Sequence, residues 1–390
     1  MLHLKSEYNE LKLDSGFLRS MPDIIHKDAF ANLFVNDTPL LDLRSPVEFK
    51  RGAFPCAINA PLLSDNEREQ VGKTYKAEGQ QAAMELGQQL VSGNTRSERL
   101  ANWCGLIEHN PATVLYCFRG GLRSQTVQSW LLESGIDVAR VEGGYKALRR
   151  FLIETIEQFS RRSELIIVAG KTGTGKTHLI NKLPNSVDLE GVANHRGSAF
   201  GKRKDAQPSQ INFEDQLAIA LLKLPFQRYK MLFLEDESRS IGSVSIPLCL
   251  YDKMSNSPLA VLEESLDQRV DTILNDYIIS NYLDYKNNAP ETVEELFEEF
   301  LLSALQRINR RLGQENYAIV KQDMESAIRQ QQDNGDTQQH RIWIARLLRD
   351  YYDPMYDYQL NKKNQRIIYR GNSEEFQNWS SHLSSGLCSP

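Results

Sequence analysis

The sequence predicts an α/β protein with two parallel-sheet domains, the second of which has a helical C-terminal part. Two strand–loop–helix units support this fold class. The first runs from the apolar stretch Val114–Tyr116 through a loop with one cysteine and two glycines into a helical stretch. The second runs from the apolar stretch Leu165–Ala169 through a glycine-rich loop into another helical stretch. Because strands alternate with helices along the chain, each sheet is expected to be parallel.

Length and composition are typical of a soluble protein with two or three domains. The chain has 390 residues, of which 41% are hydrophobic and 25% charged. No apolar run approaches the ~18–20 residues of a membrane span, and the N-terminus lacks an apolar signal core. The five cysteines are scattered without C-x-x-C spacing, which indicates a reducing cytoplasm and argues against disulfides and zinc. With a net charge of −5, the chain would need a local basic surface to bind nucleic acid.

Further strands and helices are expected on both sides of the cysteine loop. A strand over residues 40–44 ends in Asp42 and Arg44, whose charges alone are equally compatible with a solvated strand end. A short strand follows at 57–59, and helices fill residues 64–110. A strand over 136–141 then leads through Gly143 and Gly144 into a helix that ends near Arg162.

Cys117 is the expected catalytic nucleophile. Loop N–H groups in such a turn can converge on an anion, and the following helix N-terminus adds positive potential. Arg119 and Arg123 add full charges, and all of these lower a thiol pKa toward the reactive thiolate. A buried structural cysteine is the alternative. The other residues of this expected oxyanion loop are Phe118, Gly120, Gly121, Leu122 and Ser124.

The second loop matches G-x-x-x-x-G-K-[ST] between a strand and a helix, which predicts a diphosphate site. Glycines let backbone N–H groups face the phosphates, Lys176 supplies a point charge, and the Thr177 hydroxyl can hold Mg²⁺. The expected diphosphate-binding residues are Gly170, Lys171, Thr172, Gly173, Thr174, Gly175, Lys176 and Thr177.

A second acidic strand end is expected after the apolar run Met231–Leu234. Glu235 and Asp236 follow it directly, where a carboxylate of a phosphate-binding domain would reach the metal. Arg239 could pair with these acids or with substrate. No tightly bound cofactor is expected, and Mg²⁺, if used, would lie at Thr177 and Asp236; a polar strand end is the alternative.

The glycine-punctuated stretch 188–204 predicts a loop with a basic cluster. Its charged residues are equally compatible with solvated surface and with a site that grips phosphate and stacks a base on Phe200. Further along, an amphipathic helix is expected over 291–312, a loop over 330–339, and core aromatics over 340–361. The basic cluster consists of His195, Arg196, Lys202, Arg203 and Lys204.

The first domain resembles the rhodanese family. The resemblance rests on Asp42-x-Arg44, on Cys117 with Arg123-Ser124, and on Glu142-Gly143-Gly144. Rhodanese domains carry sulfur or selenium on the loop cysteine. This loop departs from the common single-domain form, because five residues, not four, separate the cysteine from the closing arginine. Since cysteine phosphatases share this longer spacing, the loop alone does not separate the two activities.

The whole chain resembles the family of bacterial tRNA 2-selenouridine synthases. The expected organisation is an N-terminal extension (1–20), a rhodanese-like domain (21–160), a P-loop NTPase-like domain (161–330) and a helical C-terminal extension packed on that domain (331–390). The stretches that carry the resemblance are 117–125, 142–149, 170–177, 188–191 with 195–201, 235–242 and 351–359.

This resemblance implies a two-step modification of the wobble uridine in tRNA. The 2-thio group is first alkylated with geranyl diphosphate, and selenium from selenophosphate then displaces the S-geranyl group. Cys117 would carry selenium as a selenosulfide, and Arg119, Arg123 and the loop N–H groups would hold the selenophosphate oxyanion. The P-loop would hold the diphosphate, and the basic cluster would contact tRNA. A selenophosphate-supplying enzyme is a further expected partner, and no membrane is involved.

Three other functions remain open from the sequence. A nucleotide-dependent RNA-modifying enzyme or kinase would place ATP or GTP on the P-loop. A cysteine phosphatase fused to a P-loop domain would use the same cysteine loop. A non-catalytic tRNA-binding protein would not need Cys117.

Overall fold

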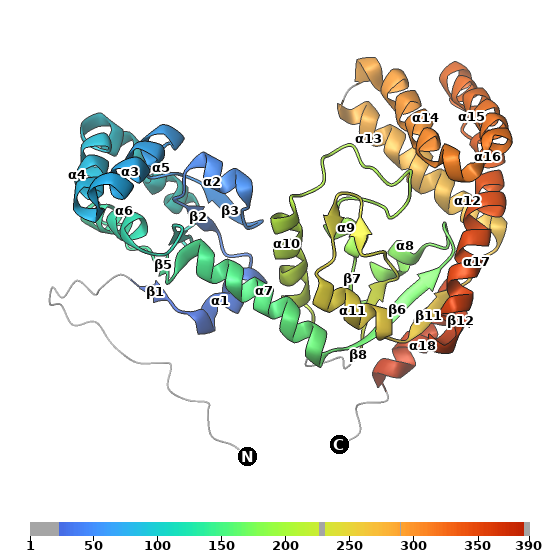
Figure 1. The fold of residues 1–390 in the computed structure, drawn as a ribbon, viewed down its shortest axis with the longest axis horizontal. Coiled ribbons are helices and arrows are strands. Elements are labelled where there is room, and N and C mark those ends of the chain that lie inside the picture. Colours follow the sequence, from blue (N-terminus) through green and yellow to red (C-terminus); the bar gives the residue numbers. More distant parts are fainter. Residues whose placement is uncertain (1–22, 226–230, 289, 386–390) are drawn as a thin grey trace.

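The computed structural model describes residues 23–225, 231–288 and 290–385, and it shows two α/β domains in succession (Figure 1). The expected extension 1–20 lies outside these described residues. Each domain is built on a five-stranded sheet, and every strand pair in both sheets is parallel. The predicted fold class is therefore confirmed.

The N-terminal sheet has the strand order β1-β5-β4-β2-β3. The strand expected over 136–141 is shorter than predicted, because the Val138 carbonyl accepts the Gln128 side-chain amide (2.9 Å) in place of a strand partner. The strands are β1 (Ile24–Ile25), β2 (Leu40–Asp42), β3 (Ala57–Asn59), β4 (Val114–Tyr116) and β5 (Arg140–Val141).

Helices cover both faces of this sheet, and α3, α4 and α5 gather at its outer end (Figure 1). Ser64 and Glu67 form the capping box that starts α3. The helix expected from Gly144 to Arg162 is confirmed. The helices are α1 (Phe30–Val35), α2 (Pro46–Arg51), α3 (Asp65–Glu78), α4 (Gln80–Leu90), α5 (Gly93–His109), α6 (Leu122–Glu133) and α7 (Gly144–Arg162), with a 3₁₀ turn at Lys27–Ala29.

The second sheet has the order β12-β11-β6-β8-β7, with the predicted P-loop strand β6 at its centre. A small antiparallel hairpin, β9–β10, lies beside it. The strands are β6 (Glu164–Gly170), β7 (Ser186–Val187), β8 (Met231–Glu235), β9 (Ser240–Ile241), β10 (Val244–Ser245), β11 (Leu259–Leu262) and β12 (Ile367–Gly371).

Five helices accompany this sheet, and a helical part is inserted between β11 and β12 (Figure 1). The sheet helices are α8 (Lys176–Ile180), α9 (Leu189–Val192), α10 (Gln210–Leu222), α11 (Leu248–Asn256) and α18 (Ser373–Ser385). The helical part contains α12 (Leu266–Ile273), α13 (Ser280–Asn288), α14 (Val293–Leu312), α15 (Gln314–Asn334), α16 (His340–Leu347) and α17 (Asp353–Lys362), π-helical turns at Leu274–Ile279 and Leu348–Tyr352, and 3₁₀ turns at Pro290–Thr292 and Asn364–Arg366.

The C-terminal stretch differs from the expected purely helical extension, because it also supplies strand β12. The run Ile367-Ile368-Tyr369 favours an extended backbone, and it pairs with β11 at the edge of the sheet. The loop expected over 330–339 is also shorter, since α15 continues to Asn334. Gln331 is buried there and lies 2.9 Å from the His340 ring, so its polarity marks a buried hydrogen bond and not a loop.

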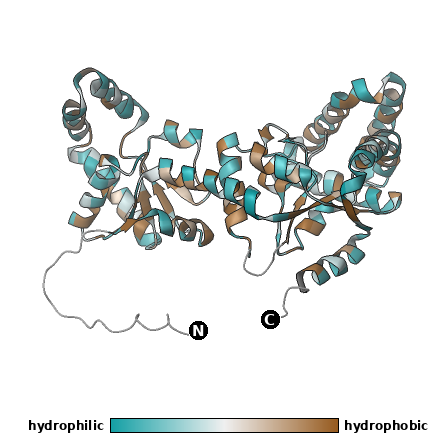
Figure 2. Ribbon diagram, turned by 60° about the horizontal axis from the view of Figure 1, so that its bottom comes forward, coloured by the Kyte–Doolittle hydropathy of each residue, from teal (hydrophilic) through white to brown (hydrophobic). Residues whose placement is uncertain are grey.

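The expected aromatic core of residues 340–361 is only partly buried. Trp343 and Tyr352 are buried against α14 and α15, whereas Tyr358 is 62% exposed. Figure 2 shows apolar strands inside both domains and mixed colours along the surrounding helices. Among the described residues, no helix combines the length and apolar character needed to cross a membrane.

The two domains share one apolar core through α7, which packs against α10 and α11. Arg149 on α7 pairs with Glu214 and Asp215 on α10. Gly52 lies at the same interface, where a Cβ atom would overlap the Ile211 side chain. The α7 helix therefore anchors the P-loop domain to the first domain.

Candidate active sites

Cys117 lies at the end of β4, the central strand of the first sheet, and begins the loop that leads into α6. Its side chain is buried, and its Sγ atom lies 3.3 Å from the Ser124 hydroxyl. That hydroxyl donates to the Gly121 carbonyl oxygen at 3.0 Å. The loop thus closes around the sulfur atom.

The start of α7 fixes the carbonyl groups of this loop. Tyr145 N–H donates to the Cys117 carbonyl (2.8 Å), and Lys146 N–H donates to the Phe118 carbonyl (3.1 Å). Only glycine fits at residue 144, since its φ is +57° and a Cβ atom would overlap the Cys117 carbonyl oxygen. In the described chain, the N–H groups of residues 119–124 have no hydrogen-bond acceptor. These donors are available to an anion bound at the loop.

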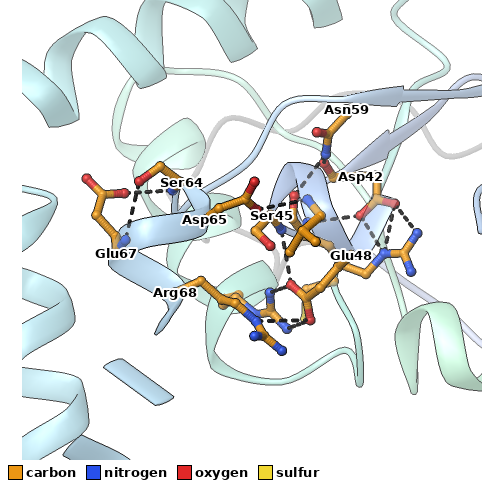
Figure 3. Close-up of polar contacts among 12 residues, drawn as sticks. Asp42, Ser45, Glu48, Asn59, Ser64, Asp65, Glu67 and Arg68 are labelled. Atoms are coloured by element: carbon orange, nitrogen blue, oxygen red, sulfur yellow. Dashed lines mark hydrogen bonds and ion pairs between the residues drawn. The ribbon is translucent and has the colours of Figure 1, made fainter. Parts of the chain in front are cut away.

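The two arginines expected at this loop have different surroundings. Arg123 donates to Glu48 at 2.8 Å, so its charge is already paired. Glu48 also lies 3.8 Å from Arg68 (Figure 3). Burial acts to raise the pKa of Glu48, but the hydrogen bond and charge of Arg123, the Ser45 N–H and the charge of Arg68 together outweigh it and hold this pKa below its usual value. Arg119 is exposed and lies near the Phe118 ring, with no ion pair in the described part of the chain. Arg119 is therefore the cation that can turn toward an oxyanion without breaking an ion pair.

The loop also carries two exposed apolar side chains. Phe118 is 36% exposed and Leu122 46% exposed, one on each side of the glycine pair. The Phe118 ring stacks on Tyr145, with centroids 6.3 Å apart. The rim of the cysteine loop is therefore apolar, although the donors inside it are polar.

Asp42 and Arg44 are not a solvated strand end. Both are buried and pair at 2.6 Å, and the Tyr116 hydroxyl donates to Asp42 at 2.7 Å. The Arg44 guanidinium lies 3.7 Å from the centre of the Tyr145 ring and donates to the Gly52 carbonyl. This pair supports the start of α7 and the domain interface.

The glycine-rich loop after β6 has the geometry of a P-loop. The Lys176 ammonium reaches back to the carbonyl groups of Gly170 (3.0 Å) and Lys171 (3.3 Å). Lys171 itself pairs with Asp353 and Asp357 on α17. The Lys176 ammonium also lies 5.7 Å from the centre of the Tyr356 ring. The α17 helix therefore covers one side of this loop.

A cavity of about 320 Å³ lies over this loop, within the range typical of ligand sites. Three cationic side chains line it: Lys176, Arg196 and Arg203. The Arg203 Nε atom is buried and has no hydrogen-bond acceptor in the described residues. An unpaired buried cationic donor is costly, so an anion in this cavity would remove that cost. We call this space the P-loop cavity.

Carboxylates also line the P-loop cavity, among them Glu190 and Glu237. The Thr177 hydroxyl donates to Glu190 (3.0 Å), and the Glu190 N–H donates to Glu235 (3.3 Å). Burial, together with the charges of Glu190 and Asp188, raises the pKa of Glu235 to about 8. Burial and Glu190 likewise raise the pKa of Glu237 well above its usual value. These acids tend to hold protons near neutral pH, which lessens their repulsion of an anion.

Asp236 does not face the P-loop cavity. It alternates with Glu235 and Glu237 along the extended chain, and its carboxylate pairs with Lys363 at 2.7 Å. The expected Mg²⁺ position at Thr177 and Asp236 therefore does not form in this structure. Across residues 23–225, 231–288 and 290–385, no group of three or more His, Cys, Asp and Glu side chains is arranged to hold a metal ion.

The structure divides the basic cluster expected to bind tRNA. Arg196 and Arg203 face the P-loop cavity, and Arg196 donates to Asn281 at 2.8 Å. Lys202 and Lys204 are exposed. His195 forms an isolated bridge with Lys202, and burial lowers the pKa of its ring, so it is neutral. Arg239 is exposed at the start of the β9–β10 hairpin and has no ion pair in the described chain.

Among the residues that line the P-loop cavity and were not predicted as site residues are Glu190, Glu237, Tyr277 and Tyr356. The alternation of side chains after β8 could have identified Glu237, since residues 235 and 237 share one face. The two tyrosines carried no such signal, because they come from the helical part, far along the chain from the P-loop.

Family models divide the chain as the structure does. The Rhodanese-like domain model matches residues 26–150, and the tRNA 2-selenouridine synthase AAA domain model matches residues 163–385. Together with the two strand-end loops, these matches define an enzyme in which a rhodanese-like domain is fused to a P-loop domain.

Curated relatives extend the match over nearly the whole chain. A tRNA 2-selenouridine synthase from Marinobacter nauticus is 48% identical over 93% of this chain and 98% of its own. One from Photobacterium profundum is 49% identical over 90% of this chain and 97% of its own. One from Pseudomonas syringae pv. tomato is 47% identical, with the same coverage. The chain belongs to the tRNA 2-selenouridine synthase family.

Proposed function

We propose that this enzyme converts the wobble 2-thiouridine of tRNA into 2-selenouridine through an S-geranyl intermediate. The observation that carries the proposal is the pairing of two anion sites in one chain. One is the P-loop cavity with three cationic side chains, and the other is the cysteine loop with its unpaired N–H groups. We place the reaction in the cytoplasm, with tRNA as a macromolecular partner and a separate enzyme supplying selenophosphate.

The P-loop cavity serves the first step. The diphosphate of geranyl diphosphate lies against the loop N–H groups, Lys176 and Arg203. The 2-thio sulfur attacks the first carbon of the geranyl group, a C–S bond forms, and the C–O bond to diphosphate breaks. Fixed cations stabilise the charge that develops on the departing diphosphate. A Mg²⁺ ion would be held by Thr177 and Glu190, with its other ligands from diphosphate, and would supply further neutralisation of that charge.

The cysteine loop serves the second step. Selenophosphate holds selenium at the selenide level, so a selenosulfide on Cys117 would need an oxidant, whereas attack at phosphorus needs none. The Cys117 thiolate attacks the phosphorus atom while Arg119 and the loop N–H groups hold the phosphoryl oxygens; an S–P bond forms, the Se–P bond breaks, and selenide leaves. At the uridine, selenide forms the C2–Se bond, the C2–S bond breaks, and sulfur leaves as geranylthiol after taking a proton. Water then hydrolyses the S–P bond, which releases phosphate and restores Cys117. The apolar rim of Phe118 and Leu122 provides a surface for the geranyl group of the incoming nucleoside.

Mass spectrometry of wobble nucleosides tests this function. The protein is incubated with thiolated tRNA, geranyl diphosphate and dithiothreitol, with and without selenophosphate. S-geranyl-2-thiouridine should form without selenophosphate and be replaced by 2-selenouridine when it is added, with no need for ATP or GTP. A product that requires a nucleotide, or selenouridine formed without geranyl diphosphate, would contradict the proposal.

A further inference from the structure

A second, smaller pocket adjoins the P-loop cavity. The two share Thr172, Ile273 and Tyr277 as lining residues, so they lie next to each other. The volume of the smaller pocket is about 30 Å³. We call it the annex, and its remaining walls are Phe200, Trp343, Ile344, Leu347, Leu348 and Tyr352.

The annex walls are held firmly by the helical core. Phe200 stacks on Trp343 with ring centroids 5.8 Å apart, and the Trp343 indole donates to the His340 ring at 2.9 Å. Burial lowers the pKa of His340 to about 4, so the ring stays neutral and can accept this bond. The six walls that belong to the annex alone are at most 8% exposed. The annex is therefore a fixed apolar space and not a surface hollow.

Polar groups are scarce in the annex. The Tyr352 hydroxyl is buried and has no hydrogen-bond partner within the described ranges. Nucleotide sugar and base atoms would lose their hydrogen bonds to water against these walls. A hydrocarbon would lose none and would gain about 25 cal/mol for each Å² removed from water. A ligand that fills both spaces thus has an anionic head and a hydrocarbon tail.

We infer that the annex receives the far end of the geranyl chain while the diphosphate lies on the P-loop. This inference rests on the function proposed above. The first part of the chain passes between Ile273, Tyr277 and Tyr356, which line the P-loop cavity. The electron-rich faces of the two tyrosine rings also suit positive charge that develops on the first geranyl carbon.

The small volume of the annex limits the length of the prenyl chain that can bind. A water molecule needs about 10–15 Å³ measured in this way, so the annex admits a small branched tip only. The end of a ten-carbon chain fits, with the rest of the chain in the larger cavity. A fifteen-carbon chain would have to push Leu347 or Leu348 aside. The annex therefore selects geranyl over farnesyl diphosphate.

Competition between prenyl diphosphates of different lengths tests this assignment. Wild-type enzyme is given thiolated tRNA with equal amounts of dimethylallyl, geranyl and farnesyl diphosphate, and the S-prenyl nucleosides are quantified by mass spectrometry. Binding of inorganic diphosphate and of methyl, geranyl and farnesyl diphosphate is measured beside it. Affinity should rise from methyl to geranyl diphosphate and fall again at farnesyl diphosphate.

Two variants move the stop in opposite directions. Leu347→Ala lengthens the annex and should raise the farnesyl-to-geranyl product ratio about tenfold or more, as expected for methylene groups in an apolar pocket. Ile344→Phe fills the annex and should shift preference toward dimethylallyl diphosphate. Leu305→Ala is the matched control, because Leu305 is buried in the same helical core but lines neither space. It should leave the ratio unchanged, and inorganic diphosphate should bind alike in every variant.

The outcomes separate this inference from the proposed function. If wild type transfers geranyl but the ratios do not respond to Leu347→Ala and Ile344→Phe, the annex is not the chain stop and the function stands. If the wild-type enzyme transfers no prenyl group, the proposed geranylation step is wrong. Should a variant lose diphosphate binding through misfolding, the wild-type series decides, and an affinity that keeps rising to farnesyl diphosphate overturns the inference.

Discussion

The loops after β4 and β6 have the same strand–loop–helix arrangement, but different residues lie over them. Each follows the central strand of a parallel sheet, contains glycines and starts a helix, which is where such sheets bind ligands. The cysteine loop carries exposed Phe118 and Leu122. The P-loop is instead overlaid by α17, which pairs with Lys171 and places Tyr356 near Lys176.

This difference indicates which substrate each loop can accept. The tRNA nucleoside has to reach both loops in the proposed reaction, and at the cysteine loop the open apolar rim suits its bulkier, geranylated form. A small prenyl diphosphate gains from an enclosed cavity, because a site shielded from water strengthens the interaction of cations with the leaving group. Changes in the two loops should therefore block different halves of the reaction.

Replacing the cysteine should give the largest effect. Cys117→Ala should abolish selenium incorporation and leave S-geranyl-2-thiouridine accumulating, because the thiol serves only the second step. Nucleoside mass spectrometry measures both products. Cys249→Ala, which removes an exposed thiol, is the control and should behave as wild type. Equal loss of geranylation in Cys117→Ala would show that the two loops do not divide the reaction.

Replacing the P-loop lysine should give the next largest effect, and this effect should fall on geranyl transfer. Lys176→Ala should slow geranyl transfer by ~10²–10³, the usual cost of losing a fixed group that stabilises transition-state charge. Already geranylated tRNA should still be selenated at the wild-type rate. Lys182→Ala, which removes an exposed lysine shortly after α8, is the matched control. Normal geranylation by Lys176→Ala would show that the P-loop has another task.

The plan of both loops could be predicted from sequence, because strand, glycines and helix are contiguous in each. Their surroundings could not. Glu48 neutralises Arg123 from 75 residues away, and Tyr356 reaches Lys176 from the other end of the domain. Such contacts depend on tertiary packing, which a local pattern does not report. Glu235 and Asp236 were both predicted at the phosphate site because they directly follow the strand. Side-chain alternation, which that prediction did not use, separates them: Glu235 accepts from the Glu190 N–H, whereas Asp236 pairs with Lys363.

The strand β12 shows a similar limit. Residues 331–390 contain mostly helical patterns, and a five-residue edge strand among them gives a weak signal. The basic cluster was likewise predicted from its residue types, which do not report where each side chain points. Lys202 and Lys204 are exposed, but Arg203 between them turns into the P-loop cavity. The prediction that all of these residues bind tRNA therefore joined residues on the exposed surface with residues in the P-loop cavity.

Salt dependence can separate those two environments. Lys202→Ala with Lys204→Ala should make the log–log salt slope of tRNA binding shallower by about 1.4 units, since each phosphate contact to a single strand contributes about 0.7. Filter binding at several salt concentrations measures this slope. Arg203→Ala should instead weaken inorganic diphosphate binding and leave the slope nearly unchanged. Lys73→Ala with Lys76→Ala, on α3, is the control; an equal slope change there would make the effect one of net charge.

The smallest effect is expected between the loops, at the domain interface. Asp215 is fully buried beside Arg149, and burial raises its pKa from 3.8 to about 7 despite that arginine. Between about pH 4 and 7 the folded protein therefore holds a proton that the unfolded chain has lost. The free energy of unfolding should fall as pH rises through this window, by at most about 1.4 kcal/mol per pH unit from this group.

Asp215→Asn removes that titration and keeps an oxygen for Arg149, so its stability should vary less with pH than that of wild type over the same window. Urea unfolding at a series of pH values, compared with Glu214→Gln, isolates the contribution of Asp215. Geranylation and selenation at pH 7 should be unchanged, because neither loop contains this residue. A variant with unaltered pH dependence would mean that Asp215 is ionised in the fold. Loss of selenation with geranylation intact would mean that α7 holds the cysteine loop in its active form through this interface.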